Sequence, residues 1–384
     1  MDYSCNTNVQ CIRHSIMRIQ HRIGSARAGL LAALLFLAPA PLAAASLDDP
    51  FVSSERQWVV TDEKFELSLK RFRQYKREPR PLPVILIHGL LVNSSFLDFG
   101  RASLAEYLAE AGFDVWNLSL RGTGRSLNPL GWGNKPWNLD DILRKDLPAV
   151  IEHVRKQAGG ADVLVVGYEL GGALALAHVG RTPEHGVAGV VSIAAPMSFD
   201  SPAQDWLDTL LKLDRVPLLR TTLLHMNSSG LNRMLFFMPW FEDAFYNRKN
   251  MAQSVRQEFL DTALTPVNRG VLDQIVTAVE QDEFVSADGK TSYRDTLSGI
   301  TIPVLLVGGG TDSIAPPEAL EQVYRELGSE DRDLMIFWPD PGEDVSYGHF
   351  DLILGRKAKD EVFPLIRSWL EAQAGGRDFL SLPR

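Results

Sequence analysis

The sequence predicts an α/β fold in which a mostly parallel β-sheet is covered by helices on both sides. Short, continuous runs of Val, Ile and Leu alternate along the chain with longer stretches of helical pattern. Apolar runs of this length are typical of strands that are buried on both faces, as in a parallel sheet. Their alternation with helices indicates crossover connections between neighbouring strands.

The elements follow from these patterns in chain order. An antiparallel pair is predicted at the start, from residues 57–60 and 65–71, where apolar and polar side chains alternate. The predicted buried strands are 84–88, 113–118, 161–167, 187–194, 302–308 and 333–337. The predicted helices are 98–111, 139–156, 171–181, 316–327 and 358–372.

Composition narrows the class of protein. The chain has 384 residues, a formal net charge of -9, and 45% hydrophobic and 23% charged residues, a balance typical of a globular protein. A net negative charge argues against a general nucleic-acid binder, because phosphate neutralisation requires a basic face. The two cysteines, Cys5 and Cys11, supply neither a disulfide framework nor a cysteine metal site to the main body.

Residues 1–45 have the pattern of an export signal. We do not expect them to be part of the fold. Arg18, Arg22 and Arg27 form a positively charged region before an apolar run, 28–39, which is too short to span a bilayer at about 20 residues per helix. The small residues at 43–45 then provide the pattern of a signal-peptidase site. We therefore expect a periplasmic or secreted protein that starts near Ser46, with retention of the segment as a membrane anchor as the alternative.

One interval interrupts the alternation of strands and helices. Residues 197–300 have much amphipathic helix pattern and no good strand, so we expect a helical cap between two parts of the core, 46–196 and 301–384. The interval contains an unusually apolar run, 234–241. This run predicts either a lipophilic substrate wall or the packing of the cap onto the body.

A strand-to-helix turn carries the first candidate site residue. Residues 163–172 read VLVVGYELGG, in which a buried strand enters a Gly-x-X-x-Gly turn and leaves as a helix. In a nucleophile elbow, the glycines allow a sharp turn that exposes the central side chain above the sheet. The central residue here is Glu169. The N-terminus of the following helix points at this position and favours negative charge there.

Three further segments complete the candidate site. The segment HGLL at 88–91 follows the first parallel strand, where it would supply a backbone N–H to an oxyanion hole, with the N–H of Leu170 as its partner. Asp312 lies just beyond a predicted strand, and His349 lies in a loop before the last helix. The chain order of elbow, acid and histidine is the order expected of this architecture.

Together these segments resemble the lipase and esterase branch of the α/β-hydrolase superfamily. The similarity is carried, in order, by HGLLVNSS, FDVWNLSLRGTGRS, DLPAVIEHV, VLVVGYELGG, VLLVGGGTDSIAPP and YGHFDLILG. The resemblance implies an α/β-hydrolase fold with a cap. It also implies that Asp312 and His349 match the family's acid and histidine, and that Leu90 and Leu170 match its oxyanion-hole positions. We expect no cofactor and no metal ion, because a local ligand pair such as His-x-x-x-His is missing.

The resemblance breaks at the nucleophile position. Lipase-type members have a serine there, whereas this chain has Glu169, which is already ionised and cannot be activated by losing a proton to histidine. Three interpretations remain open. Glu169 is itself the nucleophile, as the elbow aspartate is in haloalkane dehalogenases and epoxide hydrolases. Otherwise, the His349–Asp312 pair activates water directly, or the site is inactive and Glu169 forms an ion pair with His349.

These interpretations lead to two functional predictions. The first is an exported hydrolase of lipophilic ester-type substrates with an atypical glutamate at the elbow. The alternative is a catalytically inactive descendant that binds a small lipophilic ligand under the cap. Peripheral contact with lipid through the cap is compatible with both. We expect Ser126 to have a role in turn structure and not to replace the nucleophile, because the strained elbow lies elsewhere.

Overall fold

The structure is a computed structural model and describes residues 52–126, 137–201, 204, 244–339 and 345–375. The predicted export signal and the apolar run 234–241 lie outside these residues. Both interpretations of these segments therefore stay predictions. Within the described residues, no helix combines the length and the apolar character that crossing a membrane requires.

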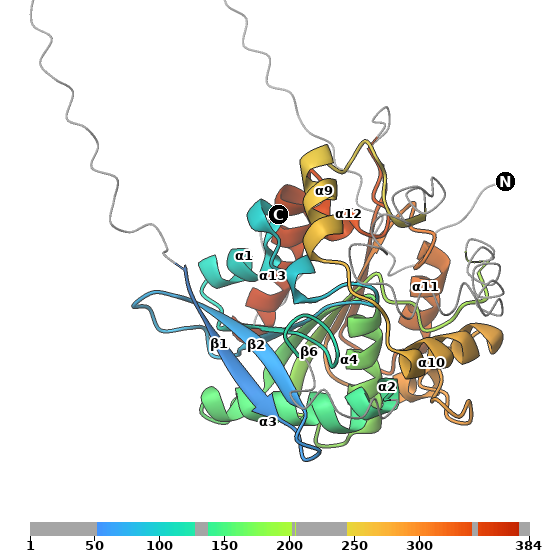
Figure 1. Ribbon diagram of the computed structural model, residues 1–384, viewed down its shortest axis with the longest axis horizontal. Helices are drawn as coiled ribbons and strands as arrows, with labels where there is room; N and C mark the ends of the chain where they lie inside the picture. The colour runs from blue at the N-terminus through green and yellow to red at the C-terminus, as the bar shows by residue number, and fades with distance from the viewer. Residues whose placement is uncertain (1–51, 127–136, 202–203, 205–243, 340–344, 376–384) are drawn as a thin grey trace, which may run out of the picture.

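An eight-stranded sheet forms the centre of the molecule, with the strand order β1-β2-β4-β3-β5-β6-β7-β8 (Figure 1). Its strands are β1 (Val52–Val60), β2 (Glu66–Gln74), β3 (Val84–Ile87), β4 (Val115–Leu118), β5 (Val163–Tyr168), β6 (Val187–Ile193), β7 (Val304–Gly309) and β8 (Arg332–Phe337). β2 pairs antiparallel with both β1 and β4, whereas all other neighbours in the sheet run parallel. The predicted mostly parallel sheet is confirmed.

Alternate residues of the central strands point to opposite faces of the sheet. In β3, Val84 and Leu86 join one hydrophobic cluster. Their neighbours Ile85 and Ile87 join the cluster on the other face. Because both faces are buried, β3 is apolar at every position, and this is the pattern that predicted a parallel sheet.

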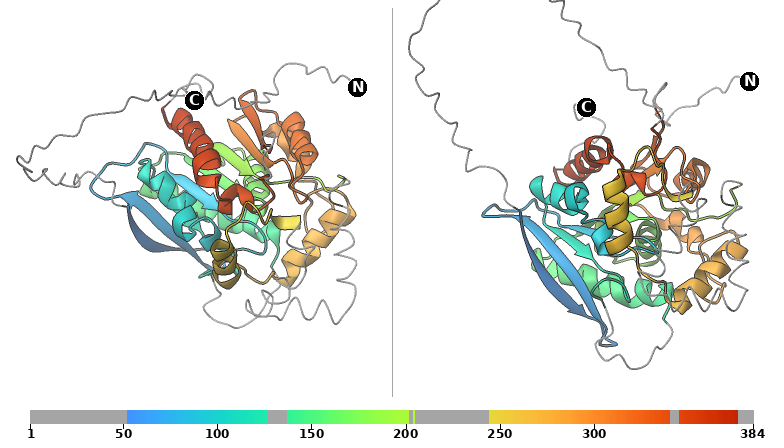
Figure 2. Two further views of the ribbon diagram at one scale, coloured as in Figure 1. Left: turned by 90° about the horizontal axis from the view of Figure 1, so that it is seen from above. Right: turned by 45° about the horizontal axis from the view of Figure 1, so that its top comes forward.

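Helices cover both faces of the sheet (Figure 2). One hydrophobic cluster contains the buried side of α1 (Leu104–Glu110) and α13 (Ala358–Gly375). The other contains the buried side of α3 (Leu147–Gln157) and α4 (Leu170–Arg181). The further helices are α2 (Leu139–Asp141), α9 (Gln253–Thr262), α10 (Arg269–Glu280), α11 (Pro317–Glu326) and α12 (Asp351–Leu354). Short 3-10 or π turns are η1 (Ser94–Phe96), η2 (Gly100–Ala102), η3 (Ile142–Asp146) and η5 (Arg294–Gly299).

One predicted helix is shorter than the pattern suggested. The range 98–111 contains the turn η2 and then α1, which begins only at Leu104. The hydroxyl of Ser103 accepts a hydrogen bond from the backbone N–H of Glu106 at 3.0 Å. Ser103 is therefore the N-cap of α1, and its extended backbone ends any helix that would start earlier.

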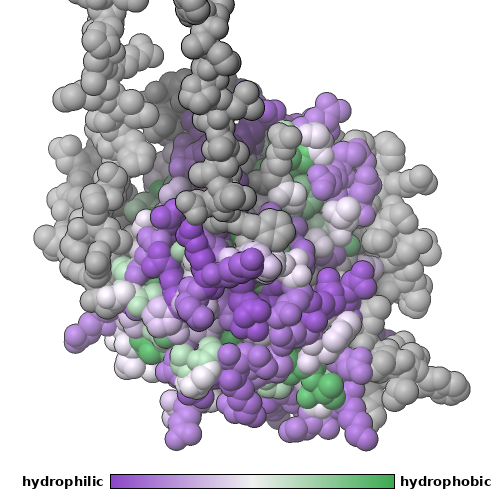
Figure 3. All heavy atoms as spheres, turned by 90° about the vertical axis from the view of Figure 1, so that its left-hand side faces the viewer, coloured by the Kyte–Doolittle hydropathy of each residue, from purple (hydrophilic) through white to green (hydrophobic). Residues whose placement is uncertain are grey.

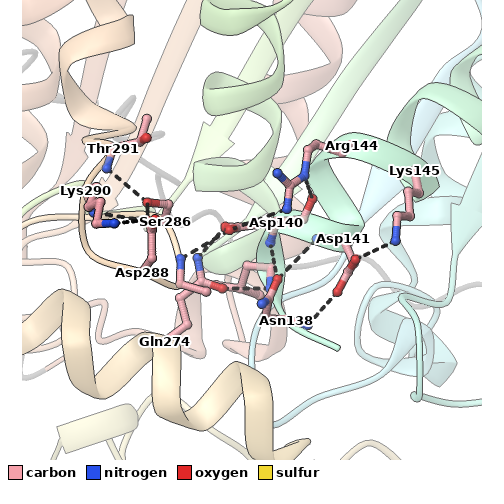
Figure 4. A network of polar contacts seen from close by, with 12 residues as sticks. Asn138, Asp140, Asp141, Arg144, Lys145, Gln274, Ser286, Asp288, Lys290 and Thr291 are labelled. Atoms are coloured by element: carbon pink, nitrogen blue, oxygen red, sulfur yellow. Dashed lines mark hydrogen bonds and ion pairs between the residues drawn. The ribbon is translucent and has the colours of Figure 1, made fainter. Parts of the chain in front are cut away.

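A buried polar network joins α10 and the segment after it to α2 (Figure 4). The carboxylate of Asp140, in α2, accepts hydrogen bonds from Gln274 Nε2 of α10 at 2.8 Å and from the Tyr293 hydroxyl at 2.5 Å. Gln274 Oε1 accepts a hydrogen bond from the backbone N–H of Leu139 at 2.8 Å. Because these buried polar groups satisfy one another, the network is a structural anchor for α10.

The side of the molecule that carries β1 and β2 has little continuous apolar surface (Figure 3). Where its residues are described, hydrophilic side chains predominate and hydrophobic ones form small, separate patches. Exposed large apolar residues at this hairpin include Trp58, Val60 and Tyr75. Single exposed apolar residues are normal on a protein surface, so this face does not indicate a docking site.

Candidate active site

A tight turn between β5 and α4 places Glu169 at the centre of the candidate site. Glu169 has φ +49° and ψ −116°, a conformation that residues other than glycine rarely adopt. Beside it, α4 approaches the end of β3 so closely that a Cβ on Gly171 would lie 2.2 Å from the carbonyl oxygen of Ile87. The predicted sharp strand-to-helix turn is therefore present, and only glycine fits at 171.

The carboxylate of Glu169 occupies the position predicted for an oxyanion. Its Oε2 atom accepts a hydrogen bond from the backbone N–H of Leu90 at 2.5 Å. The backbone N–H of Leu170 also favours the charged form of this carboxylate. Gly89 makes the approach possible, because a Cβ at that position would lie 2.5 Å from Oε2. Both predicted oxyanion-hole donors thus serve the side chain of the protein itself.

Burial and hydrogen bonding act in opposite directions on this carboxylate. Loss of water raises the pKa of Glu169, and this effect is larger than the lowering by His349 and by the N–H groups of Leu170 and Leu90. A helix N-terminus that begins at the next residue also favours the ionised form. The site therefore holds a carboxylate whose pKa lies above its ordinary value but whose charge meets several favourable partners.

Asp312 and His349 form the second half of the site. His349 Nδ1 lies 2.8 Å from Asp312 Oδ2, and both side chains are buried. Asp312 Oδ1 accepts hydrogen bonds from the backbone N–H groups of Ile314 and Ala315 at 2.8 and 2.9 Å, which fixes the carboxylate. The structure therefore brings together the predicted acid and histidine. The hydrogen bond at Nδ1 leaves Nε2 as the imidazole atom that can take up a proton.

The environment of His349 favours its protonated form. Burial lowers the pKa of His349, but the charge and hydrogen bond of Asp312, together with the charge of Glu169, outweigh burial and raise the pKa. Within the described chain, no ion pair within 4.0 Å joins Glu169 to His349. The backbone N–H of Leu90 holds Glu169 Oε2, while the charges of Glu169 and His349 each favour the ionised form of the other. The ion pair expected of an inactive site therefore stays a prediction.

The neighbouring histidine of the HGLL segment is a residue whose role the sequence did not reveal. His88 is buried and bonds through Nδ1 to the carbonyl oxygen of Gly89 at 2.8 Å. Its Nε2 accepts a hydrogen bond from the backbone N–H of Leu120 at 3.1 Å. Burial lowers the pKa of His88 to about 4, although the bond to Gly89 opposes this. A neutral His88 thus orients the peptide group whose N–H points at Glu169, and its place directly before Gly89 was the available signal.

Asp351 is a second residue that the sequence analysis missed. Its Oδ2 accepts hydrogen bonds from the backbone N–H groups of Asn247 and Gly348 at 2.7 and 2.8 Å. Its Oδ1 has no hydrogen-bond partner among the described residues. Burial raises the pKa of Asp351 to about 7, while the two N–H groups oppose this effect. An acid two residues after His349, in an otherwise apolar segment, was the signal for this group.

Asp351 gives a prediction about the pH dependence of stability. Between the ordinary pKa of 3.8 and the folded value of about 7, the folded chain holds one proton more than the unfolded chain. The free energy of unfolding therefore falls as pH rises through this range, by up to about 4 kcal/mol from this group. In Asp351→Asn, that part of the decline should disappear. Urea unfolding of both proteins between pH 4 and 8 measures it, with the exposed Asp261→Asn as control. Parallel curves for wild type and Asp351→Asn would exclude this titration.

Ser126 has the turn role that the sequence predicted. Its buried hydroxyl donates a hydrogen bond to the carbonyl oxygen of Ser119 at 2.6 Å and accepts one from the backbone N–H of Ser68 at 2.8 Å. In the same loop, Arg121 bonds to the buried carboxylate of Asp146. Through these contacts, the loop stabilises the core. Among the described residues, no three His, Cys, Asp or Glu side chains converge as metal ligands.

A small cavity adjoins the loop that holds Glu169. It has a volume of about 40 Å³ and is lined by side chains that include Leu90, Leu170 and Val271. By the same measure of volume, a cavity needs about 10–15 Å³ to hold one water molecule. The cavity therefore offers room for a short apolar group beside the two oxyanion-hole positions.

Comparison with known proteins places this geometry in a family. Residues 83–355 match the family model described as alpha/beta hydrolase fold. The chain is 22% identical over 361 residues to Lipase member N of Homo sapiens, covering 83% of this chain and 88% of that protein. It is 24% identical over 373 residues to Triacylglycerol lipase 2 of Arabidopsis thaliana, covering 83% of this chain and 85% of that protein.

Solved structures show the same fold. A thermophilic esterase from Thermogutta terrifontis superposes with a TM-score of 0.57 at 20% identity, covering 83% of this chain and 99% of that one. The monoacylglycerol lipase of Paleococcus ferrophilus superposes with a TM-score of 0.54 at 21% identity, covering 80% and 99%. With the family match spanning most of the described core, the chain belongs to the α/β-hydrolase fold family, and its relatives include lipases and esterases.

Proposed function

We propose that this protein is a hydrolase of lipophilic ester-type substrates in which Glu169 is a covalent nucleophile and His349, backed by Asp312, activates the hydrolytic water. One observation carries the proposal. Glu169 Oε2 lies 2.5 Å from the backbone nitrogen of Leu90, where an oxyanion-hole donor is expected. A donor at this position would stabilise the oxyanion that forms when water attacks an ester of Glu169.

In the first half-reaction, Oε1 of Glu169 attacks an electrophilic carbon of the substrate. A bond forms between Oε1 and that carbon, and the bond from the carbon to the leaving group breaks with its electron pair. The product of this step is a glutamyl ester of the protein. The Leu90 N–H keeps Oε2 in place and thereby orients Oε1.

In the second half-reaction, His349 Nε2 takes a proton from water, and the hydroxide adds to Cδ of the glutamyl ester. The negative charge then develops on Oε2, which already lies at the Leu90 donor. Collapse of this intermediate breaks the bond between Cδ and Oε1, and the alkoxide takes the proton from the imidazolium. The carboxylic acid that remains at Glu169 loses its proton to solvent, which restores the carboxylate. Asp312 stabilises that imidazolium through the 2.8 Å contact at Nδ1.

The same geometry restricts the reacting carbon. An acyl carbonyl oxygen has no free donor at the Leu90 position, and the charge of Glu169 would repel its developing oxyanion. We therefore expect attack at an alkyl carbon next to a leaving group that departs as a stable anion, as in an alkyl sulfate ester. A short apolar group of such a substrate fits the cavity lined by Leu90, Leu170 and Val271.

A single turnover in heavy-oxygen water tests the covalent step. Substrate in deficit should first receive an oxygen atom from Glu169, so the product carries ordinary oxygen while one oxygen of Glu169 becomes labelled. Mass spectrometry of product and of the peptide that contains Glu169 measures both. Product labelled completely from solvent would show that water attacks the substrate directly, with the His349–Asp312 pair as its base.

The second candidate function is binding without catalysis. The observation in its favour is that the Glu169 carboxylate already satisfies an oxyanion-hole donor in the free protein. A panel of acyl esters, alkyl sulfate esters, epoxides and haloalkanes of matched chain length separates the two functions. No turnover across the panel, combined with thermal stabilisation by unreactive members, would support the binding protein.

A further inference from the structure

The residues at the two ends of α9 bond to two different loops of the candidate site. After its C-terminal end, the backbone N–H of Thr265 donates to the carbonyl oxygen of Leu91 at 2.8 Å, next to the donor Leu90. Before its N-terminal end, Asn250 Nδ2 donates to the carbonyl oxygen of Ser346 at 3.1 Å, in the loop that carries His349. The residues that flank α9 therefore contact both halves of the site.

We call residues 88–93 the oxyanion loop. Its contact with the segment after α9 is centred on Asn93. The Nδ2 group of Asn93 donates to the carbonyl oxygen of Thr262 at 3.1 Å and to the hydroxyl of Thr265 at 3.2 Å. Its backbone N–H donates to the carbonyl oxygen of Ala263 at 2.9 Å. An isolated β-bridge between Val92 and Leu264 lies between these bonds. We call residues 262–265 the strap.

The loop that the strap holds is strained. Leu91 has φ +60°, in the left-handed region that a leucine seldom occupies. Such a residue costs about 1–3 kcal/mol and persists only where its surroundings enforce it. The strap supplies that enforcement, because Thr265 bonds to the carbonyl oxygen of Leu91 itself. The strained turn, in turn, directs the N–H of Leu90 at Glu169 Oε2.

Aromatic packing joins the same three elements. The ring of Phe259, on α9, lies 6.0 Å from the ring of Phe96, which follows the oxyanion loop. It lies 4.9 Å from the ring of Phe350, the residue after His349. Phe96 and Phe350 also contact each other, with ring centres 5.7 Å apart. A displacement of α9 would therefore disturb the packing beside both loops.

We propose that Asn93 is a positioning residue that fastens the strap to the oxyanion loop and so aims the N–H of Leu90 at the carboxylate of Glu169. Through α9, the strap also helps to fix the position of the oxyanion loop relative to the loop that carries His349. Asn93 positions Leu90 against Glu169 in the free protein, whereas the effect of Asn93 on the rate of ester hydrolysis rests on the proposed function.

The test compares Asn93→Ser with Asn268→Ser. Asn93 Oδ1 caps η1 by accepting from the N–H of Ser95, and Asn268 Oδ1 caps α10 by accepting from the N–H of Gly270. Serine keeps a capping oxygen at both sites, but at position 93 it is too short to replace the Nδ2 donor to the strap. The two variants therefore share a chemical change and differ in the strap.

The readout is the pKa of Glu169, followed by carbon NMR of the labelled carboxyl group and assigned with Glu169→Gln. A weaker bond from Leu90 favours the charged form less, so the pKa of Glu169 should rise in Asn93→Ser by about one pH unit. It should stay unchanged in Asn268→Ser. Because the charge of His349 also acts on Glu169, the imidazole resonances of His349 are compared in every sample to separate a change at this group from a change at the Leu90 donor.

Kinetics provide a second readout. If the glutamyl ester forms, its hydrolysis should slow about tenfold in Asn93→Ser with little change in KM, because the N–H donor acts on the intermediate. An unchanged pKa of Glu169 in folded Asn93→Ser would overturn the inference. A changed pKa with no turnover by the wild type would sustain the inference and reject the proposed function. If Asn93→Ser does not fold, Thr265→Val removes one acceptor of the strap and takes its place, with the same expected direction.

Discussion

Replacement of His349 by alanine is expected to stop turnover and to leave the substrate attached to Glu169. The first half-reaction needs only the carboxylate, so the glutamyl ester still forms. Its hydrolysis needs a base for water, and loss of a general base typically lowers the rate by about 10²- to 10⁴-fold. Intact mass spectrometry should therefore show a protein heavier by the alkyl group, and digestion should place the addition at Glu169.

The matched control is His153→Ala. His153 is half-buried and bonds through Nε2 to Gln57 at 3.0 Å, away from the candidate site. This variant should keep wild-type turnover and accumulate no ester. A His349→Ala protein that is folded, inactive and unmodified after incubation with a substrate of the wild type would contradict the covalent mechanism. It would favour direct activation of water by the His349–Asp312 pair.

The fold was predictable because its signals are local. The continuous apolar run of β3 and the glycines around Glu169 are each contained within a few residues of the chain, and each pattern has one good structural solution. Asp312 and His349 followed from their places after a strand and before a helix. The 2.8 Å contact between them is what these places require in this family of folds.

The contacts that orient Glu169 and hold the strap could not be predicted in the same way. The direction of the Glu169 carboxylate depends on Leu90, a residue 79 positions away in the chain. The strap depends on a side-chain contact between Asn93 and Thr265 across 172 positions. Neither contact leaves a pattern in a single sequence, because asparagine, threonine and leucine occur for many reasons.

Glu169→Ser is the substitution with the largest expected gain. It removes the carboxylate that occupies the Leu90 donor, so the carbonyl oxygen of an acyl ester can take its place. The serine hydroxyl stands on the same strained turn and can pass its proton to His349. One oxyanion-hole donor is worth about 10²- to 10³-fold in rate, so hydrolysis of short acyl esters should rise above that of the wild type by at least this factor.

Two further variants separate the causes of this gain. Glu169→Ala frees the donors but supplies no nucleophile, and it should remain inactive toward acyl esters. The double variant Glu169→Ser with His349→Ala should lose the activity that the single variant acquires. Because the gain needs only the donors, the imidazole and Asp312, it is expected whether the natural protein is a hydrolase or a binding protein. A folded Glu169→Ser protein without acyl-ester activity would therefore count against the alignment of Leu90 and His349 that the proposed mechanism requires.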